Sequence, residues 1–370
     1  MRIGVLRETQ AGERRVALTP DVTKRLMNAG HSVVVEMRAG AGAGLRDVAY
    51  EAQGATIGGR NEVLSADLIT TVNAPPDEAL AERTVLGLLR PLEEPWVMAA
   101  YADRGITALA FELLPRTTRA QAMDALSSQA TVSGYQGALE AAAACDRFFP
   151  MLTTAAGTIR PARALVLGAG VAGLQAIATC RRLGAVVSGF DIRAAAAEQV
   201  RSLGAAFIEA DMEPQDAASN GGYARQLETD ATERVLAALS GPVAGADVVI
   251  ATAAIPGKPA PRLISAAMVE AMRPGSVIVD IAATTGGNCE LTKPGEATDY
   301  NGVHILGFTD LPSRKPFDAS QMYARNVAAL IEIIGADGTL DLSDDILDRV
   351  TVTHGGEVRH SHIRELVAGG

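Results

Sequence analysis

Residues 164–193 read ALVLGAGVAGLQAIATCRRLGAVVSGFDIR, the most informative segment of the chain. A short apolar run leads directly into three glycines with GxGxxG spacing, Gly168, Gly170 and Gly173. A helical pattern follows, and a second apolar run ends in Asp191. This order predicts a strand, a tight turn, a helix and a second strand, which together form the first unit of a dinucleotide-binding sheet.

Each glycine of the turn has its own physical role. The first permits the tight turn, the second lets the backbone approach a pyrophosphate, and the third lets the helix pack against the strand. The helix N-terminus adds free N–H groups and a partial positive charge, both of which favour a bound phosphate. The predicted pyrophosphate cradle consists of Gly168, Gly170, Val171, Ala172 and Gly173.

The acidic residue after the second strand selects the nucleotide. Asp191 lies 21 residues after Gly170, where a carboxylate accepts hydrogen bonds from ribose hydroxyls. Its charge also repels a 2′-phosphate, by about 1–4 kcal/mol for a unit pair at about 4 Å. Arg193 is positioned to receive such a phosphate, but we expect Asp191 to dominate. Asp191, Ile192 and Arg193 are therefore predicted to bind the adenosine ribose of NAD(H).

Strand and helix patterns alternate along most of the 370 residues, which predicts an α/β fold with two Rossmann-like domains. We expect residues 1–125 and 318–370 to form the first domain, and 126–317 to form a doubly wound parallel sheet that binds NAD. Long helices over 119–145 and from 318 to 334 are expected to join them. The last 35 residues are polar, and we expect a peripheral extension.

Charge and composition exclude several functions. The net charge of −10 argues against nucleic acid as a partner. The three cysteines are far apart, so a metal site has no support. The N-terminus lacks the apolar run of a signal peptide, and no stretch reaches 18 uninterrupted apolar residues, so we expect no direct membrane insertion.

A polar segment interrupts the second domain between two predicted strands. Residues 211–240 contain Gly221 and Gly222, and a loop this long between core strands is usually functional or mobile. We expect a mobile loop near 212–240. The alternative is a helical insertion on the surface.

Several further motifs resemble one family over nearly all of residues 1–335. They are RETQAGERRVALTP (7–20), PRTTRAQAMDALSSQ (115–129), GGYA (221–224), IPGKPAP (255–261) and GGNCEL (286–291). With the fingerprint, they are similar to the alanine dehydrogenase and transhydrogenase superfamily. More narrowly, they resemble the NAD(H)-binding soluble component, domain I of the alpha subunit, of proton-translocating NAD(P)+ transhydrogenases.

The resemblance implies an activity and an assembly. A member of this family binds NADH and passes hydride to NADP+ held on a partner beta subunit, while membrane-spanning subunits couple the transfer to proton movement. It implies a homodimer that is peripheral on the cytoplasmic face of the membrane. The cofactors would be NAD(H) on this chain and NADP(H) on the partner.

The resemblance also implies residues at the nicotinamide end of the site. These are Arg116, Gln121, Asp124 and Ser127, with Arg116 and Gln121 also contacting the cofactor. An arginine–aspartate pair could lock this loop, and Gln121 could reach towards the second nucleotide. From the residues alone, helix capping by Thr118 or Asp124 is an equal alternative.

Two more segments complete the implied site. Gly222 and Tyr223 lie in the polar segment, which closes over NAD(H) in the family; a tyrosine there offers a flat face and a hydroxyl. Ala254 follows a predicted strand at the carboxyl edge of the sheet, where ligands bind in such folds.

An alanine-type dehydrogenase is the main alternative, and its catalytic residues differ. The segments that carry its lysine and histidine read TTVNAPP (70–76) and LGLLRPLEE (86–94) here, with Asn73 and Arg90 instead. Arg15 and Asp280 do match, but a guanidinium stays protonated at pH 7 and cannot act as the base. Hydride transfer between two nicotinamides needs no general base. A non-catalytic NAD-sensing module is the remaining alternative.

Overall fold

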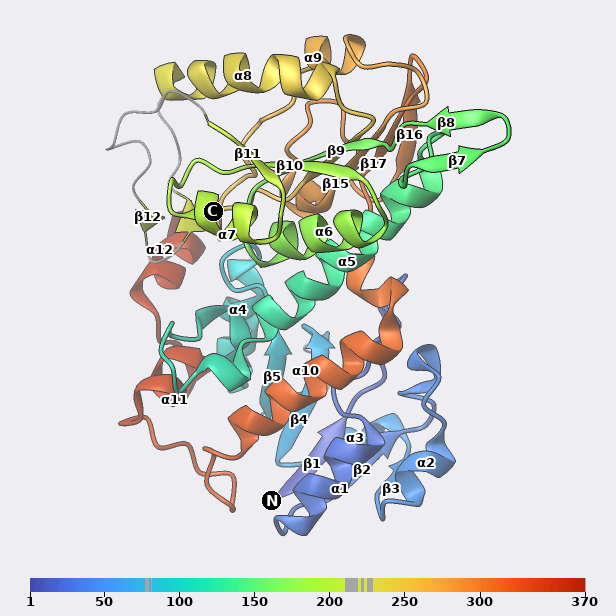
Figure 1. Cartoon of the computed structure of the whole chain (residues 1–370). Coiled ribbons are helices and arrows are strands. Elements are labelled where there is room, and N and C mark those ends of the chain that lie inside the picture. The colour runs from blue at the N-terminus through green and yellow to red at the C-terminus, as the bar shows by residue number, and fades with distance from the viewer. Residues whose placement is uncertain (77–79, 81, 210–218, 221–222, 225–228, 370) are drawn as a thin grey trace. The chain divides into compact units, whose positions relative to one another are not determined.

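The computed structural model describes residues 1–76, 80, 82–209, 219–220, 223–224 and 229–369. The chain divides into two compact units, Met1–Gln129 with Pro312–Gly370, and Ala130–Leu311 (Figure 1). The boundaries expected from the sequence, at 125/126 and 317/318, fall near the starts of two long helices, α5 (Ala125–Ala144) and α10 (Pro316–Ile331).

The first unit is built on an eight-stranded sheet with the order β19-β18-β6-β5-β4-β1-β2-β3. Its strands are β1 (Arg2–Val5), β2 (Ser32–Glu36), β3 (Thr56–Gly58), β4 (Leu68–Asn73), β5 (Thr84–Leu88), β6 (Thr107–Ala110), β18 (Thr351–His354) and β19 (Glu357–Val358). The strands from β3 to β6 are parallel and follow the 3-2-1-4-5-6 order of doubly wound folds. The α/β class predicted from the sequence is confirmed here.

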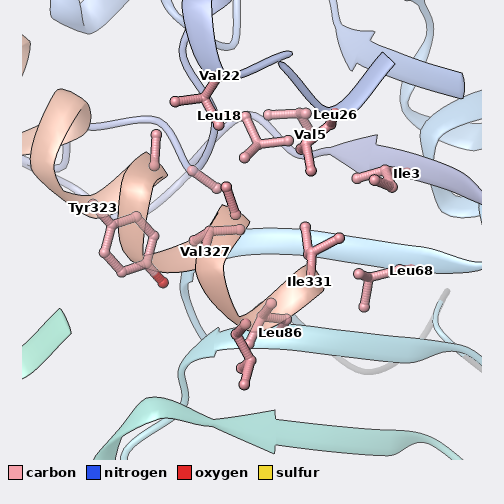
Figure 2. Close-up of a cluster of buried hydrophobic side chains, with 14 of the residues drawn as sticks. Ile3, Val5, Leu18, Val22, Leu26, Leu68, Leu86, Tyr323, Val327 and Ile331 are labelled. Carbon is pink, nitrogen blue, oxygen red and sulfur yellow. The ribbon is translucent and has the colours of Figure 1, made fainter. Parts of the chain in front are cut away.

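Helices cover both faces of this first sheet, which is why its central strands β4 and β5 are largely buried. They are α1 (Pro20–Asn28), α2 (Asp47–Glu51), α3 (Arg60–Leu64), α4 (Pro95–Asp103), α10, α11 (Asp345–Val350) and α12 (Ser361–Gly369). Figure 2 shows one face, where Tyr323, Val327 and Ile331 of α10 pack with Val5 and Leu86 from the strands. Met98 and Tyr101 of α4 belong to the core on the other face.

The expectation of a peripheral C-terminal extension is wrong. β18 pairs antiparallel with β6 and β19 pairs with β18, so the segment extends the sheet. Ile346 and Val352 are fully buried, and Ile363 is 1% exposed. The segment is polar only on average, because its few apolar residues alternate with polar ones at strand and helix spacing.

The second unit carries a seven-stranded sheet with the order β11-β10-β9-β14-β15-β17-β16. Its strands are β9 (Arg163–Leu167), β10 (Val186–Phe190), β11 (Ala206–Ile208), β14 (Val248–Ala251), β15 (Val277–Asp280), β16 (Ala297–Tyr300) and β17 (Val303–Leu306). All pair in parallel except β16, which is antiparallel to β17. The predicted doubly wound parallel sheet is therefore confirmed, with one antiparallel edge strand.

Helices also cover both faces of the second sheet (Figure 1). One face carries α6 (Val171–Arg182), α7 (Ala196–Ser202) and the C-terminal part of α5, and the other carries α8 (Thr229–Ala244) and α9 (Ala266–Glu270). Two short hairpins lie outside the sheet, β7 (Leu152–Thr154) with β8 (Gly157–Ile159), and β12 (Ser219–Asn220) with β13 (Tyr223–Ala224).

Two expected element boundaries need correction. The helix predicted from residue 119 begins at Ala125, after a 3-10 turn at Gln121–Met123. The loop predicted through residue 240 contains helix α8 from Thr229 onward, with Val235 and Leu239 fully buried. Much of the remaining expected loop, including Gly222, lies outside the described residues.

None of the helices in the described part of the chain has both the length and the apolar character of a membrane span.

Val352 tests the corrected role of the C-terminal segment. Val352→Ala removes two buried methyl groups from β18 and should lower the free energy of unfolding by about 2 kcal/mol. Val48→Ala makes the same change at a side chain that is 61% exposed, and should shift stability by less than about 0.5 kcal/mol. Denaturant unfolding of both variants gives the comparison. Equal, small effects would mean that the segment is peripheral after all.

Candidate dinucleotide-binding site

The glycine turn follows β9 at the carboxyl edge of the second sheet. Gly168 has a φ of +92°, in the left-handed region that favours glycine, and its N–H donates to the Phe190 carbonyl at 2.8 Å. A Cβ on Gly173 would lie 1.8 Å from the Gly168 carbonyl oxygen, so only glycine lets α6 approach the turn. Both observations support the roles expected for these two glycines.

Gly170 differs from its two neighbours. It is the N-cap residue of α6, and a Cβ there would meet no described atom within 4 Å. Packing among the described residues therefore does not require glycine at this position, and its predicted role in the approach of a pyrophosphate remains a prediction. Val171 and Ala172 begin α6, as expected for the cradle, and the side chain of Val171 is 43% exposed.

The strand order reverses between β9 and β14, and the turn lies at this switch point. Thr252, which follows β14, donates its hydroxyl to the carbonyls of Leu167 and Gly168 at 3.1 and 3.0 Å. The Asn288 side chain accepts from Ala253 N–H at 3.0 Å and donates to its carbonyl at 2.8 Å. These two polar residues hold the turn and the exposed Ala254 segment, and the sequence reasoning missed both. For Thr252 the signal was a polar side chain directly after the buried strand β14, whereas Asn288 lies eight residues after the end of β15 and carries no such local signal.

Asp191 links the end of β10 to the glycine turn. Its carboxylate accepts the Ala169 N–H at 2.7 Å and the Arg193 N–H at 2.8 Å. The Arg193 guanidinium binds the same carboxylate with Nε and Nη2, both at 2.9 Å. The side chain of Asp191 is only 6% exposed and that of Arg193 is 22% exposed. Asp191 thus lies next to the turn, where its ribose-binding role remains a prediction.

A second close approach shapes the cradle from helix α5. A Cβ on Gly134 would lie 2.1 Å from the Ala172 carbonyl oxygen and 3.0 Å from the Ala172 Cα. Because backbone atoms cannot move aside cheaply, Gly134 lets α5 pack directly against the first turn of α6. No motif marked this glycine in the sequence, since its partner is distant along the chain.

The predicted nicotinamide-end loop belongs to the first unit, whereas the glycine turn belongs to the second. Asp124 accepts the Ser127 N–H at 2.9 Å and the Ser127 hydroxyl at 2.6 Å, just before α5 begins. It therefore does cap the helix, as one of the two interpretations held. Arg116 and Gln121 are exposed, and their cofactor contacts remain predictions.

Glu112 lies just before this loop, and its role was not predicted from the sequence. Glu112 accepts the N–H groups of Leu89 and Arg90 at 3.3 and 2.9 Å, across the turn after β5. Arg90 has a φ of +52°, so these bonds hold a strained backbone. Burial raises the pKa of Glu112 to about 7 despite these donors.

Of the other predicted residues, Tyr223 lies in the short strand β13, paired with β12. Ile192 is partly buried and packs against the core beneath α8 and α9. The cofactor contacts predicted for both residues remain predictions.

The two positions shared with an alanine-type dehydrogenase are occupied by protein partners. Arg15 binds Glu13 at 2.6 Å and the Gln129 side chain at 2.9 Å. Although burial opposes it, hydrogen bonds and charge from Arg15 hold the pKa of Glu13 at about 2, so the pair stays ionised. Asp280 is fully buried and accepts from Cys289 N–H at 2.9 Å and the Thr292 hydroxyl at 2.7 Å.

Two doubly wound units, one with a glycine fingerprint at its switch point, define the class of Rossmann proteins that carry a dinucleotide motif. The model of the alanine dehydrogenase/PNT N-terminal domain matches residues 4–133, and that of the C-terminal domain matches residues 137–361. The chain belongs to the alanine dehydrogenase/PNT family.

Similar proteins place the chain within this family. The first section of the divided NAD(P) transhydrogenase subunit alpha of Rhodospirillum rubrum is 43% identical, over 97% of this chain and 98% of that protein. The crystal structure of a transhydrogenase from Sinorhizobium meliloti has a TM-score of 0.89 and 40% identity, and the match covers 97% of this chain and 100% of that one. An alanine dehydrogenase of Bacillus subtilis is 31% identical over 85% of this chain and 81% of that protein. The resemblance expected from the motifs is thus confirmed.

Gly134→Ala tests the contact between α5 and the cradle. The added Cβ should displace the first turn of α6 and weaken NADH binding by about tenfold or more, because the N–H groups predicted to hold the pyrophosphate move. Gly137→Ala is the matched control on the same helix, since its Cβ would meet chiefly the flexible end of the Ile281 side chain. NADH titration by fluorescence compares the two. Equal affinities would show that this approach does not position the cradle.

Proposed function

We propose that this chain binds NAD(H) at the glycine turn and transfers hydride from NADH to NADP+ held on a partner subunit. The observation that carries the proposal is the Gly168–Gly173 turn with Asp191 at its side, in a chain whose relatives include NAD(P) transhydrogenase alpha subunits. Membrane-spanning subunits of the same assembly would couple this transfer to proton translocation.

The residues at the edge of the second sheet fit an NAD(H) molecule. The free N–H groups at the start of α6 would hold the pyrophosphate, and open space beside Gly170 leaves room for it. Asp191 would bind the ribose hydroxyls and disfavour a 2′-phosphate, so that the chain holds NAD(H) rather than NADP(H).

The proposed hydride transfer requires the protein mainly to position the two nicotinamide rings. When bound, the nicotinamide of NADH supplies the hydride, and the nicotinamide of NADP+ accepts it. Arg116 and Gln121 would orient the carboxamide of the ring, and Asp124 would hold their loop through its bonds to Ser127. Tyr223, with Gly222, would close over the bound nucleotide.

An alanine-type dehydrogenase is the second candidate, and it is favoured only by shared ancestry. That reaction needs a cation for the keto-acid carboxylate and a base for the amine. Arg15 is already neutralised by Glu13, and Asn73 donates to Glu13 and Glu8 at 3.0 and 3.1 Å. An amide at this position cannot exchange a proton at neutral pH. These contacts favour the transhydrogenase over the dehydrogenase.

The proposed assembly is a homodimer docked to its partner subunits on the cytoplasmic face of the membrane. The β7–β8 hairpin and the segment that leads into it expose three large apolar side chains. Phe148 is 56% exposed, Met151 is 63% exposed and Ile159 is 44% exposed. Three exposed large apolar side chains within residues 148–159, of which Ile159 lies on the hairpin itself, support self-association of this chain.

Reconstitution with a partner tests the proposed reaction. The purified chain, mixed with an NADP(H)-binding transhydrogenase subunit, should reduce an NADP+ analogue with NADH, and should do so only when both proteins are present. The chain alone should not reduce NAD+ in the presence of L-alanine. Absorbance of the reduced analogue follows the first reaction and NADH formation follows the second.

The outcomes separate the candidates. Alanine-dependent NADH formation would overturn the proposal in favour of the dehydrogenase. NADH binding without transfer to the partner-bound analogue would leave a sensing module as the function.

A further inference from the structure

The carboxylate of Asp191 has every acceptor position occupied by a donor from its own chain. A carboxylate offers about four lone-pair positions. Oδ1 accepts from Arg193 N–H and Nε at 2.8 and 2.9 Å, and Oδ2 accepts from Ala169 N–H and Arg193 Nη2 at 2.7 and 2.9 Å. A ribose hydroxyl can therefore bind this carboxylate only if one of these donors leaves.

Two of the donors are fixed and two can move. The N–H groups of Ala169 and Arg193 belong to the glycine turn and to the segment after β10, so losing them would disrupt the turn itself. The guanidinium of Arg193 reaches the carboxylate on a flexible stem, and its side chain is 22% exposed. Because it is a side-chain donor, it is the one that a ligand can displace without disrupting the turn.

We propose that the Arg193 guanidinium is a latch that occupies the ribose position on Asp191 and is displaced when NAD(H) binds. The proposal rests on the proposed function, since it takes NAD(H) as the ligand of this edge. The guanidinium places two N–H groups on the two carboxylate oxygens, and the two hydroxyls of a ribose offer the same number of donors. One pair of donors exchanges for the other.

The Arg193 guanidinium has opposite effects on the affinities of the chain for NADH and for NADPH. Opening the Asp191–Arg193 pair subtracts from the affinity for NADH, because a bidentate, charge-assisted contact must break first. A 2′-phosphate brings negative charge to the same carboxylate, and the nearby guanidinium offsets part of that repulsion. Arg193 therefore reduces the difference in affinity of the chain for NADH and NADPH, although it binds neither nucleotide directly while it is paired with Asp191.

Removal of the guanidinium should accordingly strengthen NADH binding. In Arg193→Ala, the Asp191 carboxylate keeps its two backbone donors and gains the ribose hydroxyls without displacing a cation. We expect the Kd for NADH to fall by about three- to tenfold and the Kd for NADPH to rise. Arg193→Lys keeps the charge but cannot fork across both oxygens, so its Kd values should lie between those of the wild type and Arg193→Ala.

Arg201→Ala is the matched control for the loss of one positive charge. Arg201 lies on α7 in the same unit and pairs with Glu209 at 2.7 Å, not with Asp191. Its removal should weaken both nucleotides slightly and equally, because only the general field on the phosphates changes. Thermal unfolding of each variant without nucleotide shows that the fold is retained.

Titration of the full chain with NADH and NADPH decides the matter without any partner subunit. We expect Arg193→Ala to bind NADH more tightly and NADPH more weakly than the wild type, with the affinities of Arg193→Lys in between. Arg201→Ala should change the two affinities by the same small factor. Weaker NADH binding in both Arg193 variants would overturn the latch, because Arg193 would then be an ordinary contact of the nucleotide. The proposed function would remain intact. A wild-type chain that binds no NADH would overturn the proposed function as well.

Discussion

The hydrogen bond from Ala169 N–H to Asp191 joins the two segments on which the second unit depends. One segment is the turn that follows β9, and the other is the end of β10, which pairs in parallel with β9 from Val186 to Phe190. A buried carboxylate needs donors, and here two of them are backbone N–H groups whose direction is set by the strands. The carboxylate that joins these two segments is also the one proposed to bind the ribose.

Close backbone approaches impose the second constraint. Helix α6 reaches the turn because Gly173 has no side chain, and α5 reaches α6 because Gly134 has none. Thr252 and Asn288 then fix the neighbouring edge by bonds to main-chain atoms. The N–H groups at the start of α6 are held from three directions, which is what a site that works by positioning requires.

The sequence was informative wherever the signal was local. The fingerprint predicts the turn, the helix and the acid because each glycine acts within a few residues, and the alternation of patterns predicts both sheets. Contacts between distant segments could not be found in this way. Gly134 meets Ala172, Glu112 accepts from Leu89 and Arg90, and β18 pairs with β6, and in each case the partner is remote in sequence. The average polarity of the last 35 residues likewise concealed the few apolar side chains that bury the segment.

Recognition of the NAD(H) ribose by Asp191 is best tested by NADH and NADPH affinities in Asp191→Ala beside Glu209→Ala. Glu209 is an exposed carboxylate in the same unit, so its removal changes charge alone. Asp191→Ala should weaken NADH binding by about tenfold or more and reduce the preference for NADH over NADPH, while Glu209→Ala should alter both affinities only slightly and leave the preference unchanged. Unchanged NADH affinity in Asp191→Ala would contradict this role, because the ribose would then be bound elsewhere.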